Sequence, residues 1–106
     1  HRDLHSFPTR RSSDLKQVIL EVATARLNLE SALKRTDVAR TQVILAEEDY
    51  RMALQRYRVQ AGTNLDVLDA RVALVNAQNK LAASIYDAYT ARADFAHALG
   101  GGYEER

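Results

Sequence analysis

The 106-residue sequence contains no cysteine, no tryptophan, one proline and four glycines. The lack of cysteine excludes disulfides, thiolate metal ligands and a thiol nucleophile. Because no run of about 18 apolar residues is present, no transmembrane helix is predicted. Fifteen Lys and Arg side chains stand against fourteen Asp and Glu, and this balance argues against a dedicated nucleic-acid-binding protein, which would carry a basic surplus.

The first fifteen residues differ from the rest of the chain. They contain the only proline and two of the three histidines, and they show no helical or strand periodicity. The string HRDLHSFPTRRSSDL resembles the conceptual translation of a sequencing-library adapter. We therefore interpret residues 1–15 as an artefactual or disordered segment, to be left out of fold reasoning, and expect the gene to continue upstream, so that this chain is a C-terminal fragment.

The remaining residues favour long helices. They are rich in alanine, contain no proline, and carry twelve basic and twelve acidic side chains, so their formal charge is zero. Alanine has the highest helix propensity, and proline is the residue least compatible with a helix interior. We expect a helix over about 16–59, a turn over 60–64, a helix over about 65–99, and a tail over 103–106.

The expected turn has recognisable local signals. Gly62 can adopt a positive φ, Thr63 or Asn64 can cap the second helix, and an acidic residue in its first turn is favoured by the helix dipole. The glycine run 100–102 is expected to end that helix. A connection this short predicts an all-α antiparallel hairpin.

Apolar residues repeat every seven positions in both helices, as in a coiled coil. In the first helix the rows are Val18, Ala25, Ala32, Ala39, Ala46, Ala53 and Val22, Leu29, Thr36, Val43, Tyr50, Tyr57, with a looser set at Leu20, Leu27, Leu33, Ile44 and Leu54. In the second helix they are Leu65, Leu68, Val72, Val75, Asn79, Ala82, Tyr86, Tyr89, Ala93, Ala96 and Val67, Ala70, Leu74, Ala77, Leu81, Ala88, Ala91, Phe95, Ala98. A lone hairpin covers one stripe per helix, so the second stripe predicts further helical neighbours.

The segment around the turn carries a resemblance to a known family. Arg56–Ala70 reads RYRVQAGTNLDVLDA, and it resembles the periplasmic helix-turn-helix tip of the TolC-like outer membrane efflux proteins. Residues 74–100 resemble that family's last long helix. Gln60 departs from the glycine often found there, and Arg71 stands where glutamine is common.

The resemblance implies an architecture and a set of partners. Members are homotrimers whose long helices form a periplasmic α-barrel, so this hairpin would be part of it, and they enter the outer membrane through a β-barrel that this fragment lacks. The turn would meet a periplasmic adaptor protein and, through it, an inner-membrane transporter. The implied function is an outer membrane channel component of a tripartite efflux or type I secretion system, located in the outer membrane with this segment in the periplasm.

The resemblance also assigns roles to residues near the turn. Asp66 and Asp69 would point into the pore as rings of negative charge, and Tyr57 would hold the tip closed through a hydrogen bond. The tip residues expected to contact the adaptor are Gln60, Ala61, Gly62, Thr63 and Asn64.

Structural alternatives compete with these roles. Acidic residues near a helix N-terminus are stabilised by the dipole whatever their function, Tyr57 can be a packed aromatic residue, and the turn can be a plain connection.

The rival function is a free-standing coiled-coil interaction module, such as a periplasmic adaptor hairpin. An enzyme or a metal-binding bundle is not expected, because no nucleophile–base set is present and His97 has no second ligand at helical spacing. We expect no cofactor, no metal site and no nucleic-acid partner.

Overall fold

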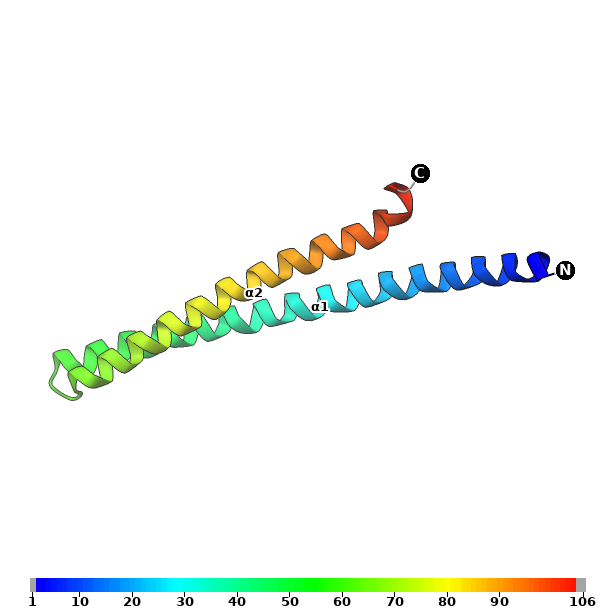
Figure 1. The fold of residues 1–106 in the computed structure, drawn as a ribbon. Coiled ribbons are helices and arrows are strands. Elements are labelled where there is room, and N and C mark those ends of the chain that lie inside the picture. The colour runs from blue at the N-terminus through cyan, green and yellow to red at the C-terminus, as the bar shows by residue number, and fades with distance from the viewer. Residues whose placement is uncertain (1, 105–106) are drawn as a thin grey trace. The chain divides into compact units, whose positions relative to one another are not determined.

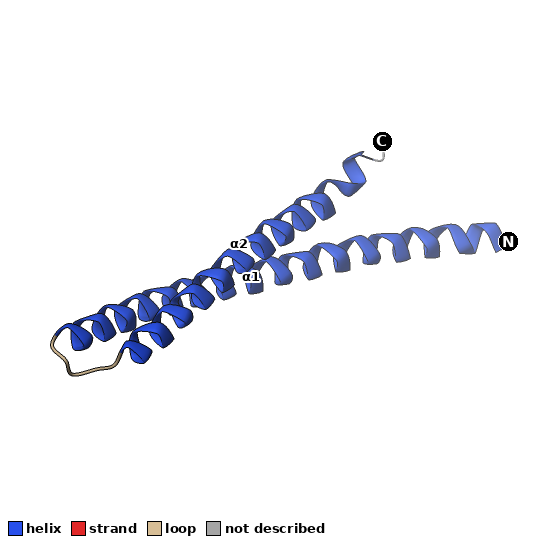
Figure 2. Ribbon diagram, turned by 60° about the vertical axis from the view of Figure 1, so that its left-hand side comes forward, coloured by secondary structure: helices blue, strands red, loops and turns tan. Residues whose placement is uncertain are grey.

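The computed structural model describes the backbone of residues 2–104 and the side chains of residues 13–100. Two helices make up this part of the chain, α1 over Arg2–Arg58 and α2 over Asn64–Glu104, and residues 59–63 join them (Figure 1). Figure 2 shows helix and one short loop only. The all-α fold expected from the sequence is confirmed.

The helix boundaries differ from the expected ones at three places. α1 begins at Arg2, before the expected start at Lys16, and it ends at Arg58. α2 continues to Glu104, so the expectation that the glycine run 100–102 ends it is wrong. Glycine weakens a helix by roughly 1 kcal/mol per residue but introduces no clash, so it does not forbid one as proline does. The origin of residues 1–15 stays a prediction.

Residues 32–88 form one compact unit, which contains the turn and the helix segments on either side of it. The residues on the facing sides recur at three- and four-residue steps. On α1 the least exposed are Ala32, Thr36, Ala39, Val43, Ala46, Tyr50, Ala53 and Leu54; on α2 they are Val67, Ala70, Leu74, Ala77, Leu81, Ser84, Ile85 and Ala88. Within this unit, the first row predicted for α1 and the second row predicted for α2 are confirmed as the seam of an antiparallel hairpin. The second row predicted for α1 is confirmed except at Tyr57, which is 48% exposed.

The tightest part of this seam lies around Thr36. Ala32, Thr36 and Ala39 are the buried residues of the described chain, with exposed fractions of 1%, 7% and 6%. The Thr36 hydroxyl donates to the carbonyl oxygen of Ala32 one turn earlier (3.1 Å) and to that of Ser84 on α2 (3.2 Å). Small side chains let the two backbones approach closely enough for this hydrogen bond between the helices.

The other unit contains the described residues 2–31 and 89–104. Its described side chains continue the heptad rows, with Val22, Ala25 and Leu29 half-buried on α1 and Ala91, Phe95 and Ala98 half-buried on α2. Val18, which was expected on the seam, is 47% exposed.

The second apolar stripe of each helix faces solvent in this single chain. On α2 the large residues left exposed are Leu65, Leu68, Val72, Val75, Tyr86, Tyr89 and Leu99, and on α1 they include Leu20, Leu27, Leu33, Val38, Ile44, Leu45 and Met52. Contiguous exposed apolar surface of this kind marks an interface. Leu54, which was expected in the looser set, is half-buried beside the seam instead.

Candidate functional site

The end of α1 is a Schellman motif. The Ala61 N–H donates to the carbonyl of Arg56 (2.7 Å), and the Gln60 N–H donates to the carbonyl of Tyr57 (3.1 Å). These are the 6→1 and 5→2 hydrogen bonds of that motif, whose turning residue adopts the left-handed conformation. Gln60 occupies this position with φ of 62°, so a non-glycine residue terminates the helix.

The prediction that Gly62 supplies the positive φ is wrong, because no described glycine has one. Gly62 is instead needed for space. A Cβ atom built on it would lie 3.1 Å from Arg56 Cβ and 3.5 Å from Asp66 Oδ2. The turn therefore passes close against the last part of α1, and any larger residue at this position has to displace a neighbour.

The start of α2 is fixed by a reciprocal capping box. The Asp66 N–H donates to Thr63 Oγ1 (3.1 Å), and the Thr63 N–H donates to Asp66 Oδ2 (3.0 Å). Thr63 is therefore the N-cap, Asn64 is the first helical residue, and Asp66 takes the place usually held by Glu or Gln. The sequence predicted a cap at Thr63 or Asn64, but it did not pair Thr63 with Asp66, although their three-residue spacing was the available signal.

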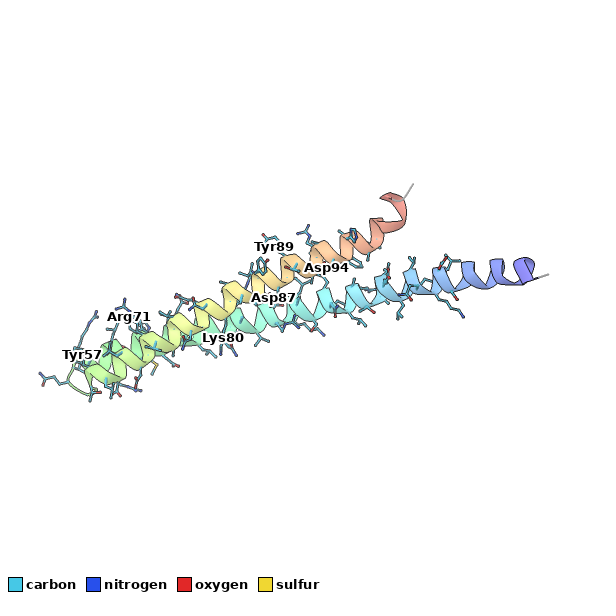
Figure 3. All side chains as sticks on the ribbon, viewed as in Figure 1. Tyr57, Arg71, Lys80, Asp87, Tyr89 and Asp94 are labelled. Carbon is cyan, nitrogen blue, oxygen red and sulfur yellow. The ribbon has the colours of Figure 1, made fainter. Side chains whose placement is uncertain are left out.

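The other predicted pore and gate residues, Asp69 and Tyr57, also lie near the turn. No described hydrogen bond joins them. Asp69 is exposed on α2, one turn beyond Asp66. Tyr57 is 48% exposed and lies at the turn end of its unit, where Figure 3 labels it with Arg71 further along α2. Gln60, Ala61, Thr63 and Asn64 are exposed, and Gly62 is half-buried. The predicted tip is thus a solvent-facing turn held rigidly at both ends.

One ion pair stands out on the adjacent surface of α1. Arg51 Nε donates to Glu48 Oε2 (3.1 Å), and its Nη2 group contacts the second carboxylate oxygen. The hydrogen bond from Arg51, assisted by its charge, lowers the pKa of Glu48, and the same contact raises the pKa of Arg51. Both groups are exposed to solvent, which screens their attraction, so the pair contributes little to the stability of the fold.

No cluster of three or more His, Cys, Asp or Glu side chains suited to a metal ion occurs among the described residues. Within the same part of the chain, neither helix has a stretch long and apolar enough to cross a membrane. The polar groups at the turn are thus backbone amides, the capping oxygens of Thr63 and Asp66, and exposed carboxylates. Such groups can bind a partner's surface and attract cations.

The comparisons with known proteins agree with this geometry. A family model described as "Outer membrane efflux protein" matches residues 9–101. The chain belongs to the outer membrane efflux protein family. The matched region takes in the seam, the turn and nearly all of α2, and it includes part of the first fifteen residues.

Three curated proteins from Pseudomonas putida are similar to this member of the outer membrane efflux protein family. They are a probable efflux pump outer membrane protein TtgC, the antibiotic efflux pump outer membrane protein ArpC and a toluene efflux pump outer membrane protein TtgC. Each is 33% identical over 91 residues, which cover 85% of this chain and 18% of the relative. The chain therefore spans about a fifth of the length of these relatives. No solved structure matches it.

Proposed function

We propose that the chain is part of an outer membrane channel component of a tripartite efflux or type I secretion system, where its hairpin forms a segment of a periplasmic conduit wall. The observation that carries this proposal is the pair of apolar stripes on each helix. One stripe is covered within the hairpin, and the other is exposed in the single chain.

The angle between the stripes favours a wall over a solid bundle. At roughly 100° per residue, the covered and exposed stripes of α2 are centred about 160° apart around the helix axis. A helix with apolar surface on nearly opposite sides packs between two neighbours in a single layer. A layer that closes on itself encloses a passage, which is the geometry a conduit requires.

The turn supplies the second part of the proposed function. Residues 60–64 form an exposed tip whose conformation is set by the Schellman motif on one side and the capping box on the other. Rigid elements that present an exposed turn are common recognition surfaces. In a homotrimeric channel this tip would contact a periplasmic adaptor protein, and energy would come from an inner-membrane transporter, so the chain itself would perform no enzymatic reaction.

A hybrid channel tests this function. The segment of the toluene efflux pump protein TtgC that matches this chain would be replaced by the chain's own residues in a Pseudomonas putida strain lacking TtgC. We expect the hybrid to restore toluene tolerance, since the replaced segment would keep both stripes and the tip. A hybrid that reaches the outer membrane at the normal level and confers no tolerance would contradict the proposal.

A matched pair of variants tests whether the exposed stripe of α2 is needed. A hybrid carrying Leu68→Lys and Val75→Lys places two charges in the exposed stripe of α2 and is expected to lose tolerance. A hybrid carrying Ala73→Lys and Gln78→Lys adds the same charge at exposed positions outside the stripe, and it is expected to retain tolerance.

Asp66 and Asp69 are proposed to line the narrow end of the conduit. Three copies of each would form rings of negative charge that attract cations. Because Asp66 also caps α2, alanine would disturb the fold as well as the charge, whereas asparagine keeps an acceptor oxygen for the Thr63 N–H. We expect Asp66→Asn and Asp69→Asn to reduce cation selectivity in single-channel recordings of the hybrid, and unchanged selectivity would overturn this assignment.

Tyr57 is proposed to help hold the tip closed through its phenol, which is half exposed and close to the turn. Tyr57→Phe removes only the hydroxyl group. We expect this substitution to raise the open-channel fraction of the hybrid, and an unchanged opening frequency would assign Tyr57 to packing alone.

A further inference from the structure

Thr36 is the one polar residue that is buried in the described part of the chain. A buried hydroxyl is costly unless it makes a hydrogen bond, and this one has two acceptors, the carbonyl oxygens of Ala32 on its own helix (3.1 Å) and of Ser84 on α2 (3.2 Å). The acceptor on α1 is enough to satisfy the hydroxyl, as the bond from Thr41 to the carbonyl of Asp37 shows on the exposed side of the same helix. The contact with Ser84 therefore needs a different explanation.

The contact between Thr36 and Ser84 defines which residues of the two helices face each other. Because the helices are antiparallel, each step forward along α1 from Thr36 is matched by the same step back along α2 from Ser84. The facing pairs of the seam are Ala32–Ala88, Thr36–Ser84, Ala39–Leu81, Val43–Ala77, Ala46–Leu74, Tyr50–Ala70 and Ala53–Val67. Every member of these pairs is buried or half-buried, as this alignment requires.

The pairs differ in how strongly their side chains can fix the alignment. In each of the five pairs nearer the turn, an alanine faces a larger residue, so that a side chain on one helix fills a space on the other. At the end of the unit 32–88 away from the turn, Ala32 faces Ala88 and Thr36 faces Ser84. Both helices present small side chains there, and such groups offer little resistance to sliding or rotation of one helix against the other.

We propose that the hydrogen bond from Thr36 to Ser84 sets the alignment of α1 and α2 at this end of the unit, where the shapes of the side chains do not. A hydrogen bond is directional and weakens steeply when it is bent, so a shift that alanine packing tolerates breaks it. When it breaks, Thr36 keeps its acceptor at Ala32, and the buried hydroxyl is not left without a partner. The bond thus selects one alignment without trapping the hairpin in it.

This role belongs to a single hairpin, so it stands whether or not the hairpin forms part of a conduit wall. The turn aligns the two helices at one end of the unit through the Schellman motif and the capping box. Thr36 aligns them at the other end. One net hydrogen bond corresponds to about a two- to tenfold preference for the bonded alignment.

Paired spin labels test this role, because the natural sequence has no cysteine and labels attach only where one is introduced. Lys34→Cys with Ala83→Cys places two labels at exposed positions beside the hydrogen bond, and Glu47→Cys with Ala73→Cys places two at exposed positions nearer the turn. Distances would be measured by pulsed electron paramagnetic resonance on the whole chain. Each labelled chain would be mixed with an excess of unlabelled chain, so that the distances arise within one molecule.

Thr36→Val removes the hydroxyl and keeps a branched side chain of similar shape. We expect the population outside the main distance to rise about two- to tenfold at the label pair beside the hydrogen bond, and to stay unchanged at the pair nearer the turn. Thr36→Ser retains a hydroxyl and should keep the narrow distribution at both pairs. Thr41→Val is the matched control, since it removes a hydroxyl that donates within α1, and it should change neither distribution.

Four results would overturn the proposal. Unchanged distances in Thr36→Val would show that the hydrogen bond does not set the alignment. Equal broadening at both label pairs would indicate a general loss of hairpin stability. Broadening of the same size in Thr41→Val would assign the effect to the hydrogen bond within α1, and broadening of the same size in Thr36→Ser would assign it to the packing of the methyl group.

Discussion

Gln60 is the one residue in the described part of the chain whose φ is positive. A left-handed conformation costs a residue with a side chain about 1–2 kcal/mol relative to the right-handed one, and Gln60 adopts it with φ of 62°. Gly62 looked like the residue for this position, because sequence reasoning assigns positive φ to glycine. The hydrogen bonds from Gln60 and Ala61 place the left-handed residue of the turn at Gln60, two residues before Gly62. Gly62 is needed because a side chain there would lie too close to Arg56.

Replacing Gln60 with glycine should therefore stabilise the turn. We expect Gln60→Gly to raise the free energy of unfolding by roughly 1 kcal/mol, measured by urea denaturation with circular dichroism. Gln60→Ala retains a Cβ atom and serves as the control, with a much smaller gain. Equal effects of glycine and alanine would show that the side chain, and not the backbone conformation, determines stability here.

Glu48 gives a prediction for acid pH. Its contact with Arg51 lowers its pKa in the folded chain, so the stabilisation is present above the unfolded value of about 4.3 and is lost as the pH falls through the lower folded pKa. We expect the Glu48 carboxyl in an NMR titration to titrate at higher pH in an Arg51→Gln variant than in the natural chain. Identical titration curves would show that the pair does not persist in solution.

At the scale of the helices, heptad spacing was the strongest signal in the sequence. It predicted Ala32, Ala39 and Ala46 on one side of α1 and Ala70 and Ala77 on the facing side of α2, all of which are covered. It could not say which of the two stripes on α2 would face α1, because both are apolar. It also passed over Ser84, a polar residue in an apolar row, whose backbone carbonyl accepts a hydrogen bond from Thr36 on the other helix.

The tight packing at Ala32 makes a specific prediction. Ala32 is 1% exposed, and a leucine there would force the two backbones apart. We expect Ala32→Leu to lower the free energy of unfolding by about 1–3 kcal/mol, the usual cost of overpacking a filled core. Ala83→Leu, at an exposed position beside Ser84, is the matched control and should change stability by less than about 0.5 kcal/mol.

For the molecule as a whole, the resemblance seen in the turn sequence predicted a family that the comparisons then showed, with the match over residues 9–101. The roles of Asp66, Asp69 and Tyr57 could not be settled in the same way. Those roles depend on what surrounds the three residues in an assembly, and a single hairpin leaves all of them exposed to solvent. What the hairpin does show is how much apolar surface it leaves for neighbours.

That surface predicts the behaviour of the isolated chain. Leu68 and Val75 remain 50% and 44% exposed, and full burial of such a side chain is worth about 1.5–3 kcal/mol. We expect the mass measured by sedimentation equilibrium to rise with protein concentration. The Leu68→Lys and Val75→Lys double variant should weaken association by about tenfold or more, because the two half-exposed side chains together stand to gain about 1.4–3 kcal/mol on burial and tenfold corresponds to 1.4 kcal/mol. Ala73→Lys with Gln78→Lys adds equal charge at exposed positions outside the stripe and should leave association almost unchanged. A monomer of constant mass at all concentrations would mean that the exposed stripes do not pair in solution, and that their neighbours are helices of other chains or of other parts of a longer one.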